Sequence, residues 1–422
     1  MKKQSEIART HLEVSRRFFL RLVGAGTLAA SELPAWAAEH ESQDAALAKV
    51  IAQLEYLTKA KDFRIVGRGK PVPSTLSPEK RLAVGLDRRS WRLTVTADEE
   101  SKAKIGNPMT VERGNALDWN GLMALARDHA VRYLKVMTCT NIGQTLGMGL
   151  WEGVPLRKII WMAKPLANIR RVYYYGYHND DPAQRFQSSL SINRVLEDPP
   201  GEKPVILCYK LNGQWLTPAS GAPVRVIVPE AYGNKSVKWL QHIVLTNDYK
   251  MNDTYATWNN DTESHLKTYA RFLLVPKQIA AHKPIPLTGL AQVGMSGLRK
   301  VQYLILPKQQ KWPADDPYFT RAPWRDAQVL PPPKKWGGGL PAGKLPPIPG
   351  QIDPKSGKPV TWPLRDTIVH WAVLAPGLDS GQYVLRCRTI DAHGYAQPMP
   401  RPLPKSGHNK IQSLPLSVGD SL

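Results

Sequence analysis

Short segments rich in β-branched and aromatic residues, separated by turn residues, recur along this chain from residue 91 onward. In the first half they occupy residues 91–96, 133–137, 171–175, 205–211, 224–228 and 242–245. Helical patterns are fewer, and the clearest spans residues 119–128. Because strands and helices do not alternate regularly, the pattern predicts a mixed α+β domain and not a βαβ array. The pair Asn212-Gly213 lies between two strand-like runs and predicts a tight type I′ hairpin.

From about residue 276 the pattern is all-β, with strand-like runs at 301–306, 368–374, 383–390 and 411–418. We expect a compact β-sandwich there. The Pro- and Gly-rich stretch 331–363 predicts either an ordered excursion or a flexible loop between strands. Apolar residues at helical spacing over 43–60 predict an amphipathic helix. A length of 422 residues suits two domains. We place them at 67–275 and 276–422, after a helix and lead-in over 38–66.

The N-terminus carries a paired-arginine motif, SRRFFLR at 15–21, followed by a short apolar segment and by Ala35-Trp36-Ala37. This order predicts a twin-arginine export signal over residues 1–37 and therefore a periplasmic location. The alternative is a basic amphipathic N-terminal helix. The apolar segment is shorter than the roughly 18 residues that a membrane span needs, and no later run approaches that length. We therefore expect no membrane span in the mature chain.

The formal net charge of +22 favours an anionic substrate or partner. Basic residues are scattered, without a Lys/Arg block, so nucleic acid is not the expected partner, and an acidic redox protein or a small oxyanion fits better. Three cysteines, Cys139, Cys208 and Cys387, leave at least one free thiol. No Cys-x-x-Cys-His occurs, so we expect no covalently bound c-type haem, and any electrons must pass to another protein.

Cys139 follows a strand-like run and precedes Gly143, Gly147 and Gly149. A thiol at the end of a strand can point into a pocket, although free cysteines are also among the residues most often buried for packing alone. The segment VMTCTN at 136–141 resembles the molybdenum-cysteine loop of the sulfite oxidase family. Further blocks follow in the family's order, PVRVIVP at 223–229, GNKSVKWL at 233–240 and DYK at 248–250. The Asn-Gly hairpin precedes them as in the family, and residues 381–398 resemble the end of its C-terminal immunoglobulin-like dimerisation domain.

The resemblance implies a mononuclear molybdenum centre with a molybdopterin cofactor and a role for each matched residue. Cys139 is then the molybdenum ligand, since a soft thiolate suits this metal. The residues at or near cofactor-binding positions are Arg225, Ser236, Val237, Lys238, His178 and Asn179. Those implied to act on the substrate are Tyr249, Arg68 and Arg401, with Arg299 a weaker candidate. Each residue also has a purely structural alternative. Arg225 could be a surface arginine on a strand, Lys238 a solvated loop charge and Arg68 an ordinary exposed arginine. Residues 178–179 could form a polar turn, and Tyr249 could be an aromatic residue at the domain boundary.

The sequence departs from the family at two positions expected to lie near the metal and its cofactor. Sulfite enzymes of the family commonly have an arginine shortly after the metal cysteine, whereas residues 140–144 contain none. Ser220 stands where the vertebrate enzymes have a histidine that contacts the cofactor. With one fewer cation near the metal, a dianion such as sulfite would bind less strongly.

The resemblance implies a periplasmic oxidoreductase that transfers an oxygen atom, oxidising sulfite or a related sulfur compound. It also implies a separate c-type cytochrome as electron acceptor and a homodimer. Three alternatives remain open: reduction of an S-oxide or N-oxide, a sulfane dehydrogenase subunit acting on protein-bound sulfur, and a catalytically silent periplasmic binding or scaffold protein.

Overall fold

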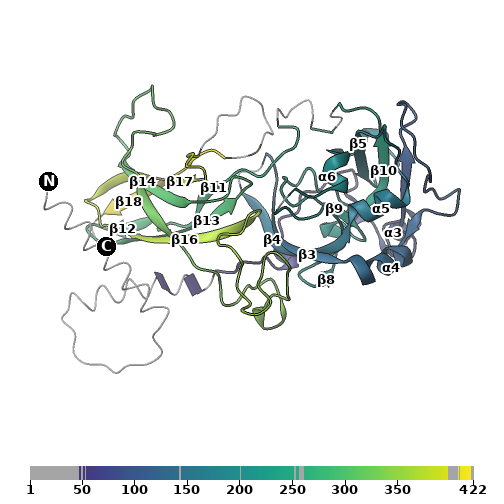
Figure 1. Ribbon diagram of the computed structural model, residues 1–422. Helices are drawn as coiled ribbons and strands as arrows, with labels where there is room; N and C mark the ends of the chain where they lie inside the picture. The colour runs from purple at the N-terminus through teal and green to yellow at the C-terminus, as the bar shows by residue number, and fades with distance from the viewer. Residues whose placement is uncertain are drawn as a thin grey trace.

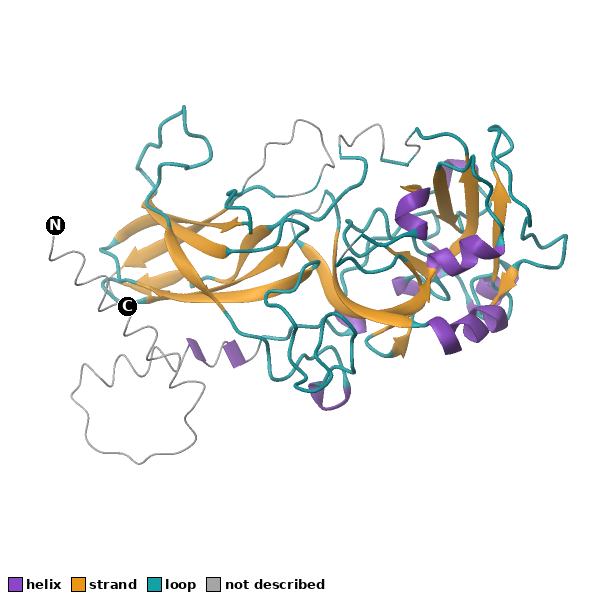
Figure 2. Cartoon of the chain, in the orientation of Figure 1, coloured by secondary structure: helices purple, strands orange, loops and turns teal. Residues whose placement is uncertain are grey.

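The computed structural model describes residues 47–48, 51–52, 54–141, 144–199, 201–250, 253–255, 261–397, 407 and 409–419. A mixed half and a β-rich half lie at opposite ends of the molecule (Figure 1). Strands dominate both halves and helices are short (Figure 2). The predicted signal at 1–37 and Arg401 fall outside the described residues. Within the described residues, no helix is both long and apolar enough to cross a membrane.

The mixed half contains two sheets with a shared apolar core. The first sheet has the order β2-β1-β10-β5-β6, in which β1 and β10 are parallel and the other pairs antiparallel. Its strands are β1 (Arg92–Ala97), β2 (Leu117–Asp118), β5 (Arg171–Gly176), β6 (Gln187–Ser191) and β10 (Leu240–Thr246). The second is antiparallel, with the order β3-β4-β7-β8 and β9 paired to β7. Its strands are β3 (Val131–Thr138), β4 (Thr145–Pro155), β7 (Ile206–Leu211), β8 (Gln214–Trp215) and β9 (Arg225–Ile227).

Four short helices accompany these sheets. They are α3 (Pro78–Ala83), α4 (Trp119–His129), α5 (Leu156–Met162) and α6 (Ile192–Leu196). The Asp118 carboxylate accepts a hydrogen bond from the Gly121 N–H at 2.8 Å and caps the N-terminus of α4. Leu122 of α4 and Ile159 of α5 are fully buried in the core between the sheets. The predicted strands, the predicted helix at 119–128 and the hairpin at Asn212 are confirmed.

The β-rich half is a sandwich of strands ordered β11-β13-β16-β15-β14-β17-β18-β12. The bounds are β11 (Tyr269–Leu274), β12 (Gln278–Ala280), β13 (Ile285–Val293), β14 (Lys300–Pro307), β15 (Arg325–Val329), β16 (Thr367–Ala375), β17 (Gly381–Ile390) and β18 (Gln412–Gly419). Strand β15 pairs with both β14 and β16 and so joins the two layers. Trp371 of β16 and Leu385 of β17 are buried in one core, which confirms the predicted β-sandwich.

Strand β4 was not expected from the sequence, because its glycines resemble those of a loop. A Cβ atom on Gly147 would lie 2.5 Å from the Phe63 ring, and one on Gly149 would lie 2.4 Å from Leu211. These glycines therefore permit close packing across an extended strand. Strand β3 ends at Thr138, and β4 begins at Thr145.

The predicted N-terminal helix over 43–60 requires correction at its C-terminal end. Residues 51–52 are helical, but residues 54–59 are not, and a short 3-10 helix follows at Ala60–Asp62. Tyr56 and Leu57 are buried, and the Leu57 N–H donates a hydrogen bond to the Trp336 carbonyl at 2.8 Å. Burial against the loop that follows β15 therefore overrides the helical periodicity.

The Pro- and Gly-rich stretch 331–363 is an ordered excursion that covers the junction of the two halves. Trp336, Ile348 and Ile352 are buried in the same cluster as side chains of β3 and β4. The Gln351 side chain accepts a hydrogen bond from the Leu134 N–H at 2.8 Å. The free edge of β3 is thus covered by this loop.

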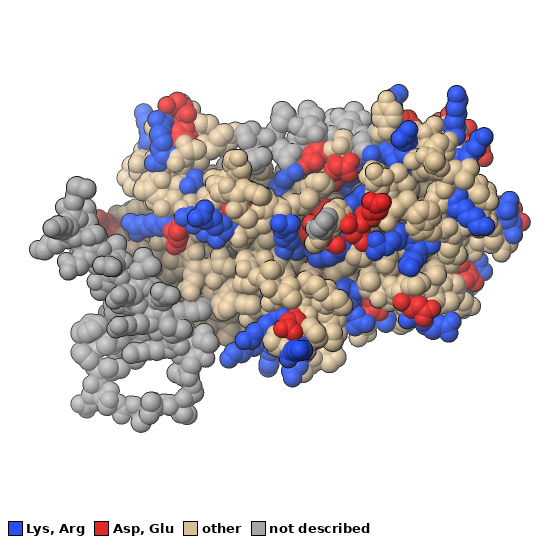
Figure 3. Space-filling model, viewed as in Figure 1, with Lys and Arg blue, Asp and Glu red and all other residues tan. Residues whose placement is uncertain are grey.

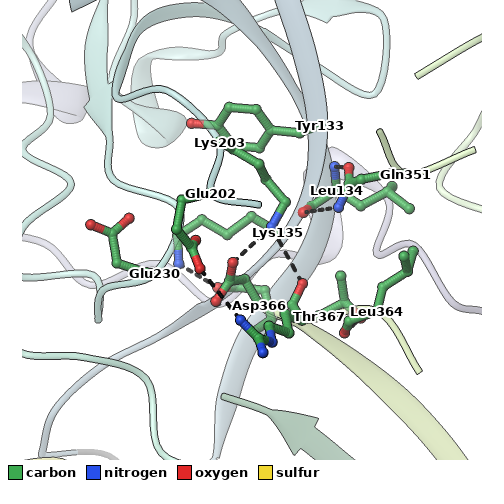
Figure 4. A network of polar contacts seen from close by, with 12 residues as sticks. Tyr133, Leu134, Lys135, Glu202, Lys203, Glu230, Gln351, Leu364, Asp366 and Thr367 are labelled. Atoms are coloured by element: carbon green, nitrogen blue, oxygen red, sulfur yellow. Dashed lines mark hydrogen bonds and ion pairs between the residues drawn. The ribbon is translucent and has the colours of Figure 1, made fainter. Parts of the chain in front are cut away.

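A buried charge network also crosses the junction (Figure 4). Lys203 lies 2.7 Å from the carboxylate of Asp366, which is 1% exposed and directly precedes β16. Arg194 pairs with Glu230 at 2.7 Å. Lys135 of β3 is fully buried, and burial lowers its pKa to about 7. The Lys203–Asp366 pair thus ties the residue before β16 to the mixed half.

Candidate active site

A cavity lies at the C-terminal end of β3, and its wall comes from segments far apart in the sequence. The lining residues fall within 60–69, 137–151, 176–186, 219–225 and 233–239, together with Tyr255. None of these lining residues is Asp or Glu, whereas four are Arg or Lys. The cavity therefore attracts anions.

Cys139 lines this cavity, and its side chain is 9% exposed. Its Sγ donates a hydrogen bond to Oδ1 of Asn141 at 2.6 Å. Among the described residues, no three His, Cys, Asp or Glu side chains gather in a way that could hold a metal ion. A metal bound at Cys139 would accordingly take its remaining ligands from a cofactor.

The other two cysteines are buried within strands, Cys208 in β7 and Cys387 in β17. Burial raises the pKa of the Cys208 thiol to about 12, and it raises the pKa of Cys387 as well. Both thiols therefore stay protonated and contribute packing.

Two cations lie on the cavity wall, Arg225, which is buried, and Lys238, which is partly buried. Arg225 is 4% exposed and donates to the carbonyl oxygens of Ser220 and Ser236, at 2.9 and 2.7 Å. Its Nε atom is buried without a hydrogen-bond partner among the described residues. Lys238 donates to the Ala219 carbonyl at 2.7 Å.

The charges of these two side chains are not balanced by a carboxylate in the part of the chain that the structure describes. Burial and, to a smaller extent, repulsion from Arg225 lower the pKa of Lys238 to about 7. Burial also lowers the pKa of Arg225 to about 10. An anionic group in the cavity would supply the missing charge.

The remaining cofactor candidates are mostly at the cavity. Ser236, Val237 and His178 line it, and Nδ1 of His178 is buried without a partner among the described residues. Asn179 does not line the cavity but lies at its rim, where its Nδ2 donates to the Pro71 carbonyl at 2.8 Å. Ser220 lines the cavity, and its hydroxyl accepts a hydrogen bond from the Thr217 hydroxyl at 3.0 Å.

The structure corrects the expected placement of the active-site tyrosine. Tyr249 is 77% exposed and does not line the cavity. Tyr255 lines it instead, and its hydroxyl accepts a hydrogen bond from Nη2 of Arg68. Burial raises the pKa of Tyr255, opposed by the charge of Arg68 and reinforced by Cys139. Tyr255 lies five residues beyond the matched DYK block, so no motif identified it.

Arg68 lies on the cavity wall, where it contacts two aromatic rings. Its guanidinium carbon is 4.0 Å from the centre of the Phe186 ring and 5.0 Å from that of Tyr255. Phe186 also lines the cavity and was not identified from the sequence. Arg299 lies outside the lining, at the start of β14.

A family model described as "Oxidoreductase molybdopterin binding domain" matches residues 83–254. Among curated proteins, a nitrate reductase [NADPH] of Neurospora crassa is 38% identical over 105 residues, which is 24% of this chain and 10% of that protein. An inducible nitrate reductase [NADH] of Glycine max is 26% identical over 181 residues, 42% of this chain and 19% of that protein. The chain thus spans only a tenth to a fifth of these relatives.

Among solved structures, the sulfane dehydrogenase SoxCD from Paracoccus pantotrophus superposes with a TM-score of 0.53. The alignment covers 85% of this chain and 86% of that one at 16% identity. This likeness extends over both halves of the molecule and concerns the fold. The family match, by contrast, contains Cys139, Arg225 and Lys238 and ends one residue before Tyr255.

Proposed function

Because this chain is an oxidoreductase of the sulfite oxidase family, we propose that it is a molybdenum enzyme that oxidises sulfite or a related sulfur oxyanion by oxygen-atom transfer. One observation carries the proposal. A buried thiol, Cys139, faces the same cavity as the buried Arg225 and the partly buried Lys238, two cations that have no carboxylate partner among the described residues.

The residues present fit a molybdopterin cofactor. Cys139 would bind the molybdenum as a thiolate. Arg225 and Lys238 would pair with the cofactor's phosphate, and Ser236 and Val237 would lie against its ring system. When bound, the cofactor supplies the two-electron redox chemistry of oxygen-atom transfer, while the protein contributes binding, orientation and electrostatics.

The substrate would meet the cofactor at the part of the cavity that contains Arg68 and Tyr255. Arg68 would bind an oxyanion through its N–H groups, and the Tyr255 hydroxyl would orient one of the anion's oxygens. The absence of Asp and Glu from the lining favours anion entry.

We further propose that the electrons pass to a separate c-type cytochrome. Lys and Arg side chains spread over the visible face, interspersed with fewer acidic ones (Figure 3). A basic surface of this kind would speed docking of an acidic partner. The twin-arginine motif supports a periplasmic location, and the C-terminal sandwich would serve as an immunoglobulin-like dimerisation domain.

A sulfane dehydrogenase role is the second candidate, because the fold alignment with SoxCD includes the C-terminal sandwich. Reduction of an S-oxide or N-oxide is a third, since the curated relatives are nitrate reductases. A catalytically silent scaffold protein would not require a thiol, Cys139, in the same cavity as two cations, Arg225 and Lys238, that have no carboxylate partner among the described residues.

A substrate panel on the molybdenum-loaded enzyme tests the proposal. We expect sulfite oxidation coupled to cytochrome c, and no oxidation by the Cys139→Ser variant. Turnover only with reduced viologen and sulfoxides, or only with sulfur bound to a carrier protein, would replace the proposal with the corresponding alternative. A chain purified from a cofactor-competent host without molybdenum would favour the scaffold.

A further inference from the structure

A buried ion pair joins the loop 233–238 to the segment 253–255. Lys235 lies between Asn234 and Ser236, which both line the cavity, but Lys235 itself does not. Its side chain is 0% exposed, and its Nζ atom lies 2.5 Å from Oδ2 of Asp253. The same Nζ donates to the Ser189 carbonyl at 2.9 Å. The pair thus connects the expected cofactor loop to a residue two positions before Tyr255.

The next residue, Thr254, fixes this segment against the start of β6. The Thr254 N–H donates to the Gln187 carbonyl at 3.1 Å, and the Gln187 N–H donates to the Thr254 hydroxyl at 3.0 Å. Phe186 and Tyr255 each adjoin this bonded pair. Their rings consequently meet edge to face, with centres 5.5 Å apart.

Arg68 completes the group, since its guanidinium contacts both rings and donates to the Tyr255 hydroxyl. No carboxylate among the described residues forms an ion pair with it. A guanidinium held by aromatic rings keeps its charge and several N–H donors for an anion.

We propose that Lys235 and Asp253 are positioning residues, whose ion pair ties the cofactor loop to the Phe186–Tyr255 pair and so holds Arg68 ready to bind an oxyanion. The inference rests on the proposed function, because it takes this cavity as the place where substrate meets cofactor. A positioning role affects substrate binding more than the chemical step, since preorganisation lowers the ordering cost of binding.

The test is calorimetric titration of the molybdenum-loaded enzyme with sodium sulfate, alongside steady-state kinetics with sulfite. We expect Asp253→Asn to weaken sulfate binding and raise KM by about tenfold each, while kcat changes by less than about threefold. Asp253→Glu keeps the negative charge but lengthens the side chain by one methylene group. We therefore expect sulfate affinity and KM to change in the same direction as in Asp253→Asn, but by less. Lys203→Met, which breaks a buried ion pair outside the cavity wall, should leave sulfate affinity within about twofold.

Phe186→Leu provides a second test that leaves the ion pair intact. Phe186→Leu should weaken sulfate binding as Asp253→Asn does. Phe186→Tyr keeps an aromatic ring at this position and should bind sulfate as the parent enzyme does. The matched control is Phe272→Leu, which removes a ring in edge contact with Trp371 at 5.3 Å inside the sandwich.

Sulfate affinity within about twofold of the parent in Asp253→Asn and Asp253→Glu would overturn the positioning role, as would equal losses in the two control variants. If sulfite is not oxidised but sulfate affinity falls as expected, the positioning role is supported and only the proposed substrate fails.

Discussion

The Gly233 N–H donates a hydrogen bond to the carbonyl oxygen of Thr138, 2.8 Å away. This bond joins the start of the 233–238 loop to the end of β3, directly before Cys139. The thiol and the cation Lys238 therefore lie on two segments that are fixed to each other.

Replacing Cys139 with serine should lower the molybdenum content of the purified protein without unfolding the chain, because serine keeps the shape but not the soft thiolate, while the cofactor's own ligands to the metal remain. Metal analysis of purified protein, with circular dichroism to monitor the fold, measures this. Cys387→Ala is the matched control, since it removes a buried thiol from the sandwich. Stoichiometric molybdenum in Cys139→Ser would contradict the assignment of the ligand.

Substitution of Tyr255 and substitution of Tyr249 should have different effects on catalysis. Tyr255→Phe removes the hydroxyl that accepts from Arg68 and should lower kcat/KM by about tenfold or more. Tyr249→Phe alters an exposed side chain and should leave kcat/KM within about twofold. Steady-state kinetics of both variants measures the two effects. A larger loss of kcat/KM in Tyr249→Phe than in Tyr255→Phe would support Tyr249, the tyrosine of the DYK block, as the active-site residue.

The candidate site residues that the structure brings together at the cavity belong to contiguous blocks of the sequence. Cys139, Arg225 and Lys238 stand in motifs that carry their spacing with them, and Asn212-Gly213 encodes its own turn through local backbone preferences. These features depend on neighbours in the chain, so a linear pattern is enough to find them.

What the sequence did not reveal depends on contacts between distant segments. Phe186 and Tyr255 meet only because Thr254 pairs with Gln187, 67 residues away. The glycines of β4 could not be told from loop glycines until the Phe63 ring was seen against Gly147. Long-range packing of this kind leaves no periodic signal.

Gly147→Ala should lower the free energy of unfolding by about 1–3 kcal/mol, because the new Cβ would collide with the Phe63 ring. Gly419→Ala, where the nearest atom would lie 3.9 Å from the added Cβ, should change it by less than about 0.5 kcal/mol. Urea denaturation of both variants checks this. Equal stability in the two would mean that Phe63 moves aside freely.

The pH dependence of stability should reveal the buried Lys135. Burial lowers its pKa to about 7, whereas a lysine in the unfolded chain titrates near 10.4. Between these pH values the unfolded state holds a proton that the folded state has released, so this lysine makes the free energy of unfolding rise with pH. Its contribution to the slope is at most about 1.4 kcal/mol per pH unit.

Lys135→Met removes this contribution, so its unfolding free energy should rise less steeply than that of the parent between about pH 7.5 and 9.5. Lys61→Met, at an exposed lysine, is the control and should follow the parent curve. Chemical denaturation at several pH values measures all three proteins. Parallel curves for Lys135→Met and the parent would mean that Lys135 remains charged in the fold, compensated by Asp366 and Glu230 of the junction network.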